Sequence, residues 1–112
     1  MPYFDSHCHL AMDQFDPDRP EVIALCQQAG VGMLTVGVDV GSSRAGIDLA
    51  RRHPGVWAGV GVHPCDCLDL GEEDWQTLQD LARLPEVVAV GETGLDNHWR
   101  AVPLERQAYW FR

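Results

Sequence analysis

Short apolar segments alternate with amphipathic segments along the whole of this 112-residue chain. The apolar segments are typical of strands, and the amphipathic ones carry apolar residues at helical spacing. Strands are predicted at residues 3–7, 33–38, 56–62 and 87–90, and helices at about 19–29, 41–52, 71–84 and from Pro103 onward. Strands that are separated by helices are joined by right-handed crossovers and lie parallel. The alternation therefore predicts an α/β fold built around a parallel sheet.

Four strand–helix units are half of a TIM-barrel (β/α)8 fold, which typically needs about 250 residues. The chain stops inside the fourth predicted helix, with no helix-terminating signal after Arg112. No internal repeat and no linker interrupts it. We therefore expect residues 1–112 to be a single, incomplete domain that covers about the first four βα units of such a barrel.

Acidic side chains outnumber basic ones by 17 to 8, which gives a formal net charge of −9. An acidic chain is a poor non-specific binder of nucleic acid, because contacts to phosphate rest on lysine and arginine. If nucleic acid is the substrate, a bound metal ion must supply the local positive charge.

The N-terminal residues lack the basic region and the long apolar core of a signal peptide, and no apolar run approaches the length of a membrane span. The four cysteines, Cys8, Cys26, Cys65 and Cys67, do not form the framework of a secreted protein. We expect a cytoplasmic protein with free thiols, including the two of the Cys65-x-Cys67 segment.

His7 and His9 stand at the end of the first predicted strand. Side chains two residues apart on a strand point to the same face. Two neighbouring imidazoles can share one divalent ion, because the neutral imidazole nitrogen is a preferred ligand of zinc and related metals. The spacing therefore predicts a metal-binding pair, whereas two ordinary strand-end histidines are the simpler alternative.

Polar residues also follow the other predicted strands. Asp39 follows the second strand, His63 the third and Glu92 the fourth, with Asp96 and His98 just beyond. In parallel α/β folds, functional sites lie outside the carboxyl ends of the strands. His7, His9 and Glu92 therefore form a plausible metal set of two imidazoles and one carboxylate.

Three blocks of this sequence resemble the TatD family of metal-dependent deoxyribonucleases, which are TIM-barrel members of the amidohydrolase superfamily. The blocks are Phe4-Asp5-Ser6-His7-Cys8-His9-Leu10, Gly61-Val62-His63-Pro64 and Val88-Ala89-Val90-Gly91-Glu92-Thr93-Gly94-Leu95-Asp96. Their spacing fits as well, and Gln107 with Phe111 resembles the helix that follows. The resemblance covers the whole chain but less than half of a typical member.

The resemblance implies a hydrolase that cleaves phosphodiester bonds in DNA through metal-activated water. His7 and His9 would bind the first of two divalent ions (Mg, Mn or Zn), and Glu92 would bridge both and serve as the catalytic carboxylate. His63 would face the substrate phosphate. Family members take two further histidines and an aspartate from later strands, and this chain ends before all three.

The sequence departs from the family in three places. Thr93 stands where an aliphatic residue is usual, Asn97 where an aromatic one is common, and Cys65 and Cys67 where another histidine is frequent. These departures bear on substrate detail more than on metal binding.

Other residues are assigned supporting roles. Asp5 is interpreted as a structural acceptor below the metal site, and Asp96 as a residue behind the ligands that orients Glu92 or another ligand. His98 is interpreted as exposed. The four tryptophans are interpreted as packing residues rather than base-stacking platforms; they are Trp57, Trp75, Trp99 and Trp110.

Two alternatives remain open from the sequence. One is another amidohydrolase-type reaction, such as ester or amide hydrolysis. The other is a truncated, non-catalytic remnant, whose open half barrel would expose edge strands and apolar inner faces and would self-associate.

Overall fold

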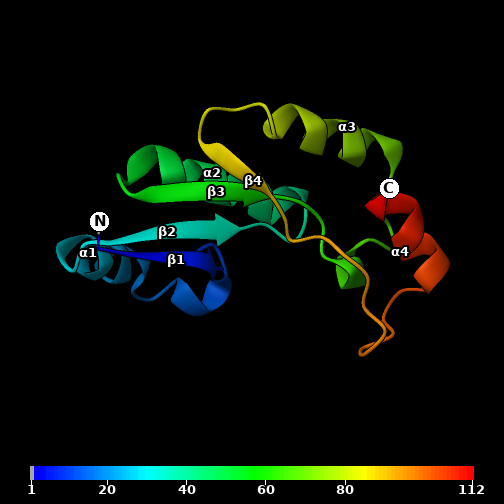
Figure 1. Cartoon of the computed structure of the whole chain (residues 1–112), viewed down its shortest axis with the longest axis horizontal. Coiled ribbons are helices and arrows are strands. Elements are labelled where there is room, and N and C mark those ends of the chain that lie inside the picture. The colour runs from blue at the N-terminus through cyan, green and yellow to red at the C-terminus, as the bar shows by residue number, and fades with distance from the viewer. Residues whose placement is uncertain (1) are drawn as a thin grey trace.

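The computed structural model describes residues 2–112, which form a four-stranded parallel sheet in the order β1-β2-β3-β4 (Figure 1). The strands are β1 (Tyr3–Cys8), β2 (Val31–Val36), β3 (Val56–Val60) and β4 (Val87–Val90). The helices are α1 (Arg19–Gln28), α2 (Val40–Arg52), α3 (Glu72–Leu81) and α4 (Leu104–Phe111), with short 3-10 helices η1 (Asp13–Phe15) and η2 (Pro64–Asp66). The predicted α/β class and parallel sheet are confirmed.

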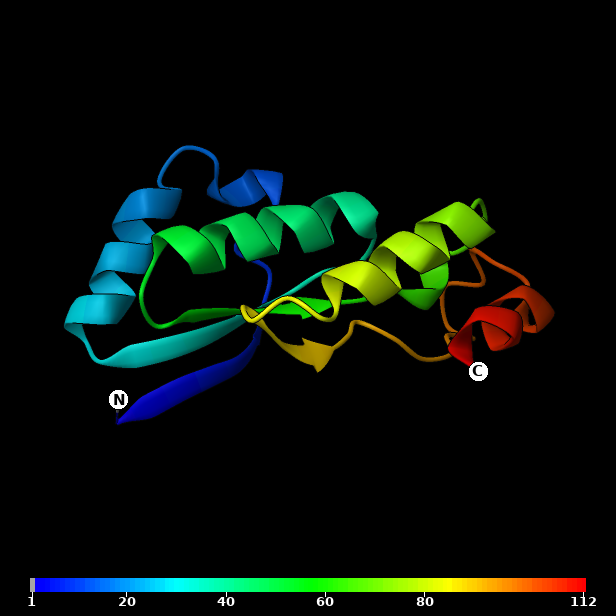
Figure 2. The same cartoon turned by 90° about the horizontal axis from the view of Figure 1, so that it is seen from above.

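The helices are distributed unevenly about the sheet. Helices α1, α2 and α3 lie on one side of it, and the opposite side carries no helix among residues 2–112 (Figure 2). Helix α4 lies beyond the carboxyl ends of the strands rather than against the sheet (Figure 1). The side chains at those carboxyl ends are therefore left accessible.

The core lies between the sheet and the helices. Ile23 of α1 packs with Met33 of β2 and Val56 of β3, and Ile47 of α2 packs with Ala58 of β3. All five are at most 4% exposed. Burial of each large aliphatic side chain stabilises the fold by about 1.5–3 kcal/mol.

The opposite face of the sheet is open. Phe4 of β1 is 50% exposed, and Val88 and Val90 of β4 are 57% and 73% exposed. β4 therefore alternates between covered and open positions instead of being buried on both faces. In a closed barrel, this face would be the interior.

Several element boundaries differ from the prediction. β2 begins two residues early, because Gly30 adopts a positive φ of 70° and turns the chain directly into the strand. β3 ends at Val60, since the Gly61 N–H bonds to the Ser43 hydroxyl instead of continuing the ladder. α2 begins at Val40, because Asp39 rather than the following Gly-Ser-Ser segment caps it.

Within residues 2–112, no helix has the length and apolar character needed to span a bilayer.

Candidate metal centre

Three predicted ligands meet at the carboxyl edge of the sheet. His7 belongs to β1, His9 follows it directly, and Glu92 follows β4. His7 Nε2 lies 3.2 Å from His9 Nε2, and Glu92 Oε2 lies 3.5 Å from the first nitrogen and 3.3 Å from the second. The two ends of the strand order thus contribute to one cluster.

Glu92 reaches this cluster because its backbone crosses the end of the sheet. A flat sheet would hold β1 and β4 about 14 Å apart, at roughly 4.8 Å per strand. Beyond β4, the Glu92 N–H instead donates to the Gly37 carbonyl, 2.6 Å away at the end of β2. The segment passes over Gly61 so closely that a Cβ there would lie 2.7 Å from the Glu92 carbonyl oxygen. The absence of a side chain at Gly61 therefore lets Glu92 face the histidines.

A hydrogen bond to the backbone sets the tautomer of neutral His9. Its Nδ1 lies 3.0 Å from the Val36 carbonyl oxygen. A carbonyl only accepts hydrogen bonds, so Nδ1 carries the proton and donates it. Neutral His9 therefore presents a bare Nε2 lone pair toward His7 and Glu92. A backbone partner on the other ring nitrogen is the usual way in which a protein orients a metal-binding histidine.

The donor set fits a divalent ion. It offers two imidazole nitrogens and one carboxylate oxygen, and such ligands suit zinc and other divalent transition metals. Ligand atoms at about 2.0–2.1 Å from a four-coordinate ion would lie roughly 3.3 Å from one another. The three separations of 3.2, 3.3 and 3.5 Å agree with that spacing. The cluster is also accessible, because the His7 side chain is 52% exposed.

His63 lies at the same edge but in the opposite tautomer. It caps η2, and its Nδ1 accepts the Cys65 backbone N–H at 3.0 Å. In neutral His63 the proton therefore resides on Nε2, which faces Glu92 Oε1 at 3.7 Å. This arrangement makes His63 a hydrogen-bond donor toward the cluster, not a bare ligand.

Asp5 and Asp96 lie on either side of the cluster. Asp5 Oδ1 accepts the His7 backbone N–H at 3.0 Å, where β1 shifts register against β2. Asp96 is held by Gln107, whose Oε1 accepts its backbone N–H at 2.7 Å. The Asp96 carboxylate contacts the Cys65 thiol and the Trp99 N–H. Asp96 thus reaches the cluster through Cys65 and His63, and the contacts described for it do not include Glu92.

Two other strand-end residues lie outside the cluster. Asp39 accepts the Ser42 N–H at 2.7 Å and the Ser42 hydroxyl at 2.6 Å, so its carboxylate is occupied in capping α2. His98 is exposed, as predicted, with its ring edge-to-face against Trp99.

All four cysteines are free. Burial, and then the neighbouring Asp5 carboxylate, raise the pKa of Cys8 to about 11. Burial first, and then the Asp96 carboxylate, raise the pKa of Cys65. Thiols with raised pKa values are poor nucleophiles at neutral pH.

The interpretation of the tryptophans is wrong for one of them. Trp57 packs against Phe4, and Trp75 packs against Trp110 with ring centroids 5.9 Å apart. Trp99 is instead 73% exposed. Its exposure could have been predicted, because Trp99 lies in a polar segment (residues 96–100) without helical or strand periodicity.

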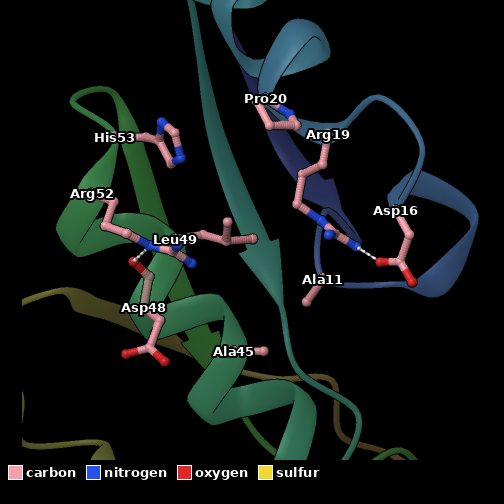
Figure 3. Close-up of a pocket in the computed structure, with 9 residues that line it drawn as sticks. All are labelled: Ala11, Asp16, Arg19, Pro20, Ala45, Asp48, Leu49, Arg52 and His53. Atoms are coloured by element: carbon pink, nitrogen blue, oxygen red, sulfur yellow. Dashed lines mark hydrogen bonds and ion pairs between the residues drawn. The ribbon is translucent and has the colours of Figure 1, made fainter.

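A separate cavity lies between α1 and α2, on the helical side of the sheet (Figure 3). It has a volume of about 370 Å³ and is lined by Ala11, Asp16, Arg19, Pro20, Ala45, Asp48, Leu49, Arg52 and His53. Arg19 donates to Asp16 at 2.6 Å, and Arg52 donates to the Asp48 carbonyl at 3.2 Å. These two cations already have partners within the protein.

Comparison with known proteins identifies relatives over nearly the whole chain. Residues 4–112 match the family described as "TatD related DNase". A metal-dependent hydrolase of Bacillus subtilis, YabD, which is described as uncharacterized, is 36% identical over 97% of this chain and 43% of its own length. The "3'-5' ssDNA/RNA exonuclease TatD" of Erwinia tasmaniensis is 41% identical over 96% of this chain and 42% of its own length.

A solved structure agrees with the sequence matches. The crystal structure of YjjV, a TatD homologue from Escherichia coli, superposes with a TM-score of 0.86 at 28% identity. The superposition covers 97% of this chain and 43% of that one. The chain thus spans less than half the length of the relatives it matches, consistent with a partial barrel.

Proposed function

Because the chain belongs to the TatD related DNase family, we propose that the full-length protein is a metal-dependent hydrolase that cleaves phosphodiester bonds in DNA. The observation that carries the proposal is the convergence of His7, His9 and Glu92, whose ligand atoms lie within 4.8 Å of one another. The printed name of the Erwinia relative makes single-stranded DNA and RNA the first substrates to test.

Each residue has a defined task in this proposal. His7 and His9 would hold a divalent cation through Nε2, and Val36 and Asp5 keep the two histidines in place. Glu92 contributes a carboxylate to the same ion and extends its second oxygen, Oε1, toward His63. A divalent cation supplies positive charge beside a phosphate and lowers the pKa of water. The −9 charge of the chain makes that local positive charge necessary for an anionic substrate.

His63 has the substrate-facing role. Its Nε2–H lies 3.7 Å from Glu92 Oε1, and a phosphate oxygen beside Glu92 would accept the same proton. Asp96 supports His63 indirectly through Cys65. We assign two divalent ions, from Mg, Mn or Zn, to the complete site, of which the described triad holds one.

The test uses the full-length protein stripped of metal with a chelator. Single-stranded DNA labelled at its 5' end should be degraded only after Mg²⁺, Mn²⁺ or Zn²⁺ is restored. An ester and an amide substrate should remain intact under the same conditions. Absence of metal-dependent cleavage of any nucleic acid, or preferential cleavage of the ester or amide, would contradict the proposal.

Two further expectations concern the protein in solution. Its free cysteines fit a reducing compartment, and we propose the cytoplasm; cell fractionation tests this. If residues 1–112 are produced alone, their open sheet face and edge strands should cause self-association. Light scattering that finds a stable monomer of the isolated chain would contradict this expectation.

A further inference from the structure

Among residues 2–112, Trp99 is the one tryptophan that leaves most of its surface in water, at 73% exposure. It lies in the segment of residues 95–102 that follows Glu92 and extends beyond the carboxyl ends of the strands (Figure 1). Exposing a large apolar ring to water is unfavourable, and an aromatic ring at a protein surface often marks a binding position. The position of Trp99 therefore calls for a partner.

The segment that carries Trp99 is held firmly. The Trp99 backbone N–H donates to Asp96 Oδ2 at 2.9 Å. Gln107, which is 2% exposed, accepts the Asp96 N–H and donates to the carbonyls of Asp96 and Val102 at 2.9 and 2.8 Å. The indole is thus exposed on an anchored turn and is not the tip of a loose loop.

A chain of contacts links this turn to the candidate metal centre. The carboxylate that holds Trp99 also accepts the Cys65 thiol at 3.6 Å. The Cys65 N–H donates to His63 Nδ1, and His63 Nε2 faces Glu92. Trp99 is therefore tied through Asp96, Cys65 and His63 to the cluster where the phosphodiester would be cleaved.

The neighbours of Trp99 suit a nucleic-acid strand. His98 lies against its ring at a centroid distance of 4.8 Å. Arg100 follows directly and is exposed, and within residues 2–112 it has no ion pair. An aromatic face beside a free guanidinium offers a stacking surface for a base and a cation for the adjoining phosphate.

We propose that Trp99 is a stacking platform for an unpaired nucleobase of a strand whose phosphodiester lies at the His7–His9–Glu92 cluster, with Arg100 contacting the backbone phosphate. A base inside a duplex is already stacked on both faces, so the indole is available only to an unpaired base or to a base at a strand end. This inference rests on the proposed nuclease function and names the substrate form for the same site.

The test compares variants of the full-length protein in Ca²⁺ at low ionic strength, with a fluorescent phosphorothioate oligothymidylate as the probe. Trp99→Ala should weaken binding about 10-fold, the loss typical of one stacked base. Trp99→Phe should lose less, because it keeps an aromatic face. Tyr109→Ala removes another exposed aromatic side chain, from α4, and should bind like the wild type. An abasic oligomer of equal length should bind wild type and Trp99→Ala alike.

Three outcomes would overturn the inference: no binding of the oligothymidylate by the wild type, equal binding by Trp99→Ala, or shielding of Trp99 from acrylamide quenching in the full-length protein. The last is read from the difference between wild type and Trp99→Phe. Failure of the nuclease proposal would look different, since the probe would still bind through Trp99 but no nucleic acid would be cleaved with Mg²⁺, Mn²⁺ or Zn²⁺.

Discussion

His9, after β1, and His63, after β3, both face Glu92, but their rings are in different tautomers. His9 donates a hydrogen bond from Nδ1–H to the Val36 carbonyl, which leaves Nε2 without a proton. His63 accepts a backbone N–H at Nδ1, from Cys65, and so offers an Nε2–H. The backbone atom that meets Nδ1 therefore decides whether the histidine can be a ligand or a donor. The predictions below test that distinction.

The largest effect on divalent-metal affinity is expected for His9→Ala. Loss of a bare nitrogen from the cluster should weaken divalent-metal affinity about 100-fold or more, since even supporting residues of metal sites cost 10–100-fold. Titration calorimetry with Mn²⁺ or Zn²⁺ measures it. His53→Ala is the matched control, because His53 lines the cavity between α1 and α2 and should leave affinity unchanged (Figure 3). Equal loss in both variants would refute the assignment.

The next variant, Glu92→Gln, tests the rate of hydrolysis. The amide keeps the size of the side chain but removes the negative charge that faces His7, His9 and His63. We expect the rate of metal-dependent hydrolysis to fall by about 10²–10⁴, the range for loss of a positioned acid or base. Initial rates on single-stranded DNA measure it, with Glu105→Gln, at an exposed position of α4, as the control. Wild-type rates in Glu92→Gln would exclude Glu92 from the chemistry.

His63→Ala should separate substrate from metal. It removes a donor, not a ligand, so metal affinity should stay at the wild-type value. KM for single-stranded DNA should rise about 10-fold or more, the loss of a hydrogen bond to a charged group. A fall in metal affinity like that of His9→Ala would show that the two histidines are equivalent, which contradicts the distinction.

The smallest effect is expected at Asp96, which reaches His63 only through Cys65. The Asp96 carboxylate contributes to the raised pKa of Cys65, after burial. Asp96→Asn removes that charge, so the pKa should fall and the thiolate fraction at pH 8 should rise. Alkylation of Cys65 by iodoacetamide, followed by mass spectrometry, should become severalfold faster. An unchanged rate would mean that Asp96 does not influence this side of the site.

Much of the fold could be predicted from the sequence. The α/β class, the four strands and the beginnings of α1 and α4 followed from local periodicity, proline positions and turn residues. The residues at which β2 and β3 end could not be predicted in this way, because long-range hydrogen bonds determine them. The Ser43 hydroxyl takes the Gly61 N–H, and the sequence offers no local sign of that contact. The family resemblance drawn from the three sequence blocks is confirmed by the match over residues 4–112.

The residues of the site could be predicted from the sequence better than their geometry could. Strand-end position alone drew attention to His7, His9, His63 and Glu92. It also drew attention to Asp39, whose carboxylate caps α2 through local bonds that compete with any ligand role. The tautomers depend on backbone atoms of Val36 and Cys65, which no residue pattern reveals. The exposure of Trp99 depends on a turn anchored by buried Gln107, eight residues further along the chain.

The central claim is that His7, His9 and Glu92 hold a divalent ion, and anomalous diffraction from crystals grown with Mn²⁺ or Zn²⁺ tests it most directly. We predict an anomalous peak within about 2.0–2.3 Å of His7 Nε2, His9 Nε2 and a Glu92 carboxylate oxygen, with His63 Nε2 outside that distance. A peak elsewhere, or one ligated by His63 in place of His9, would contradict the account.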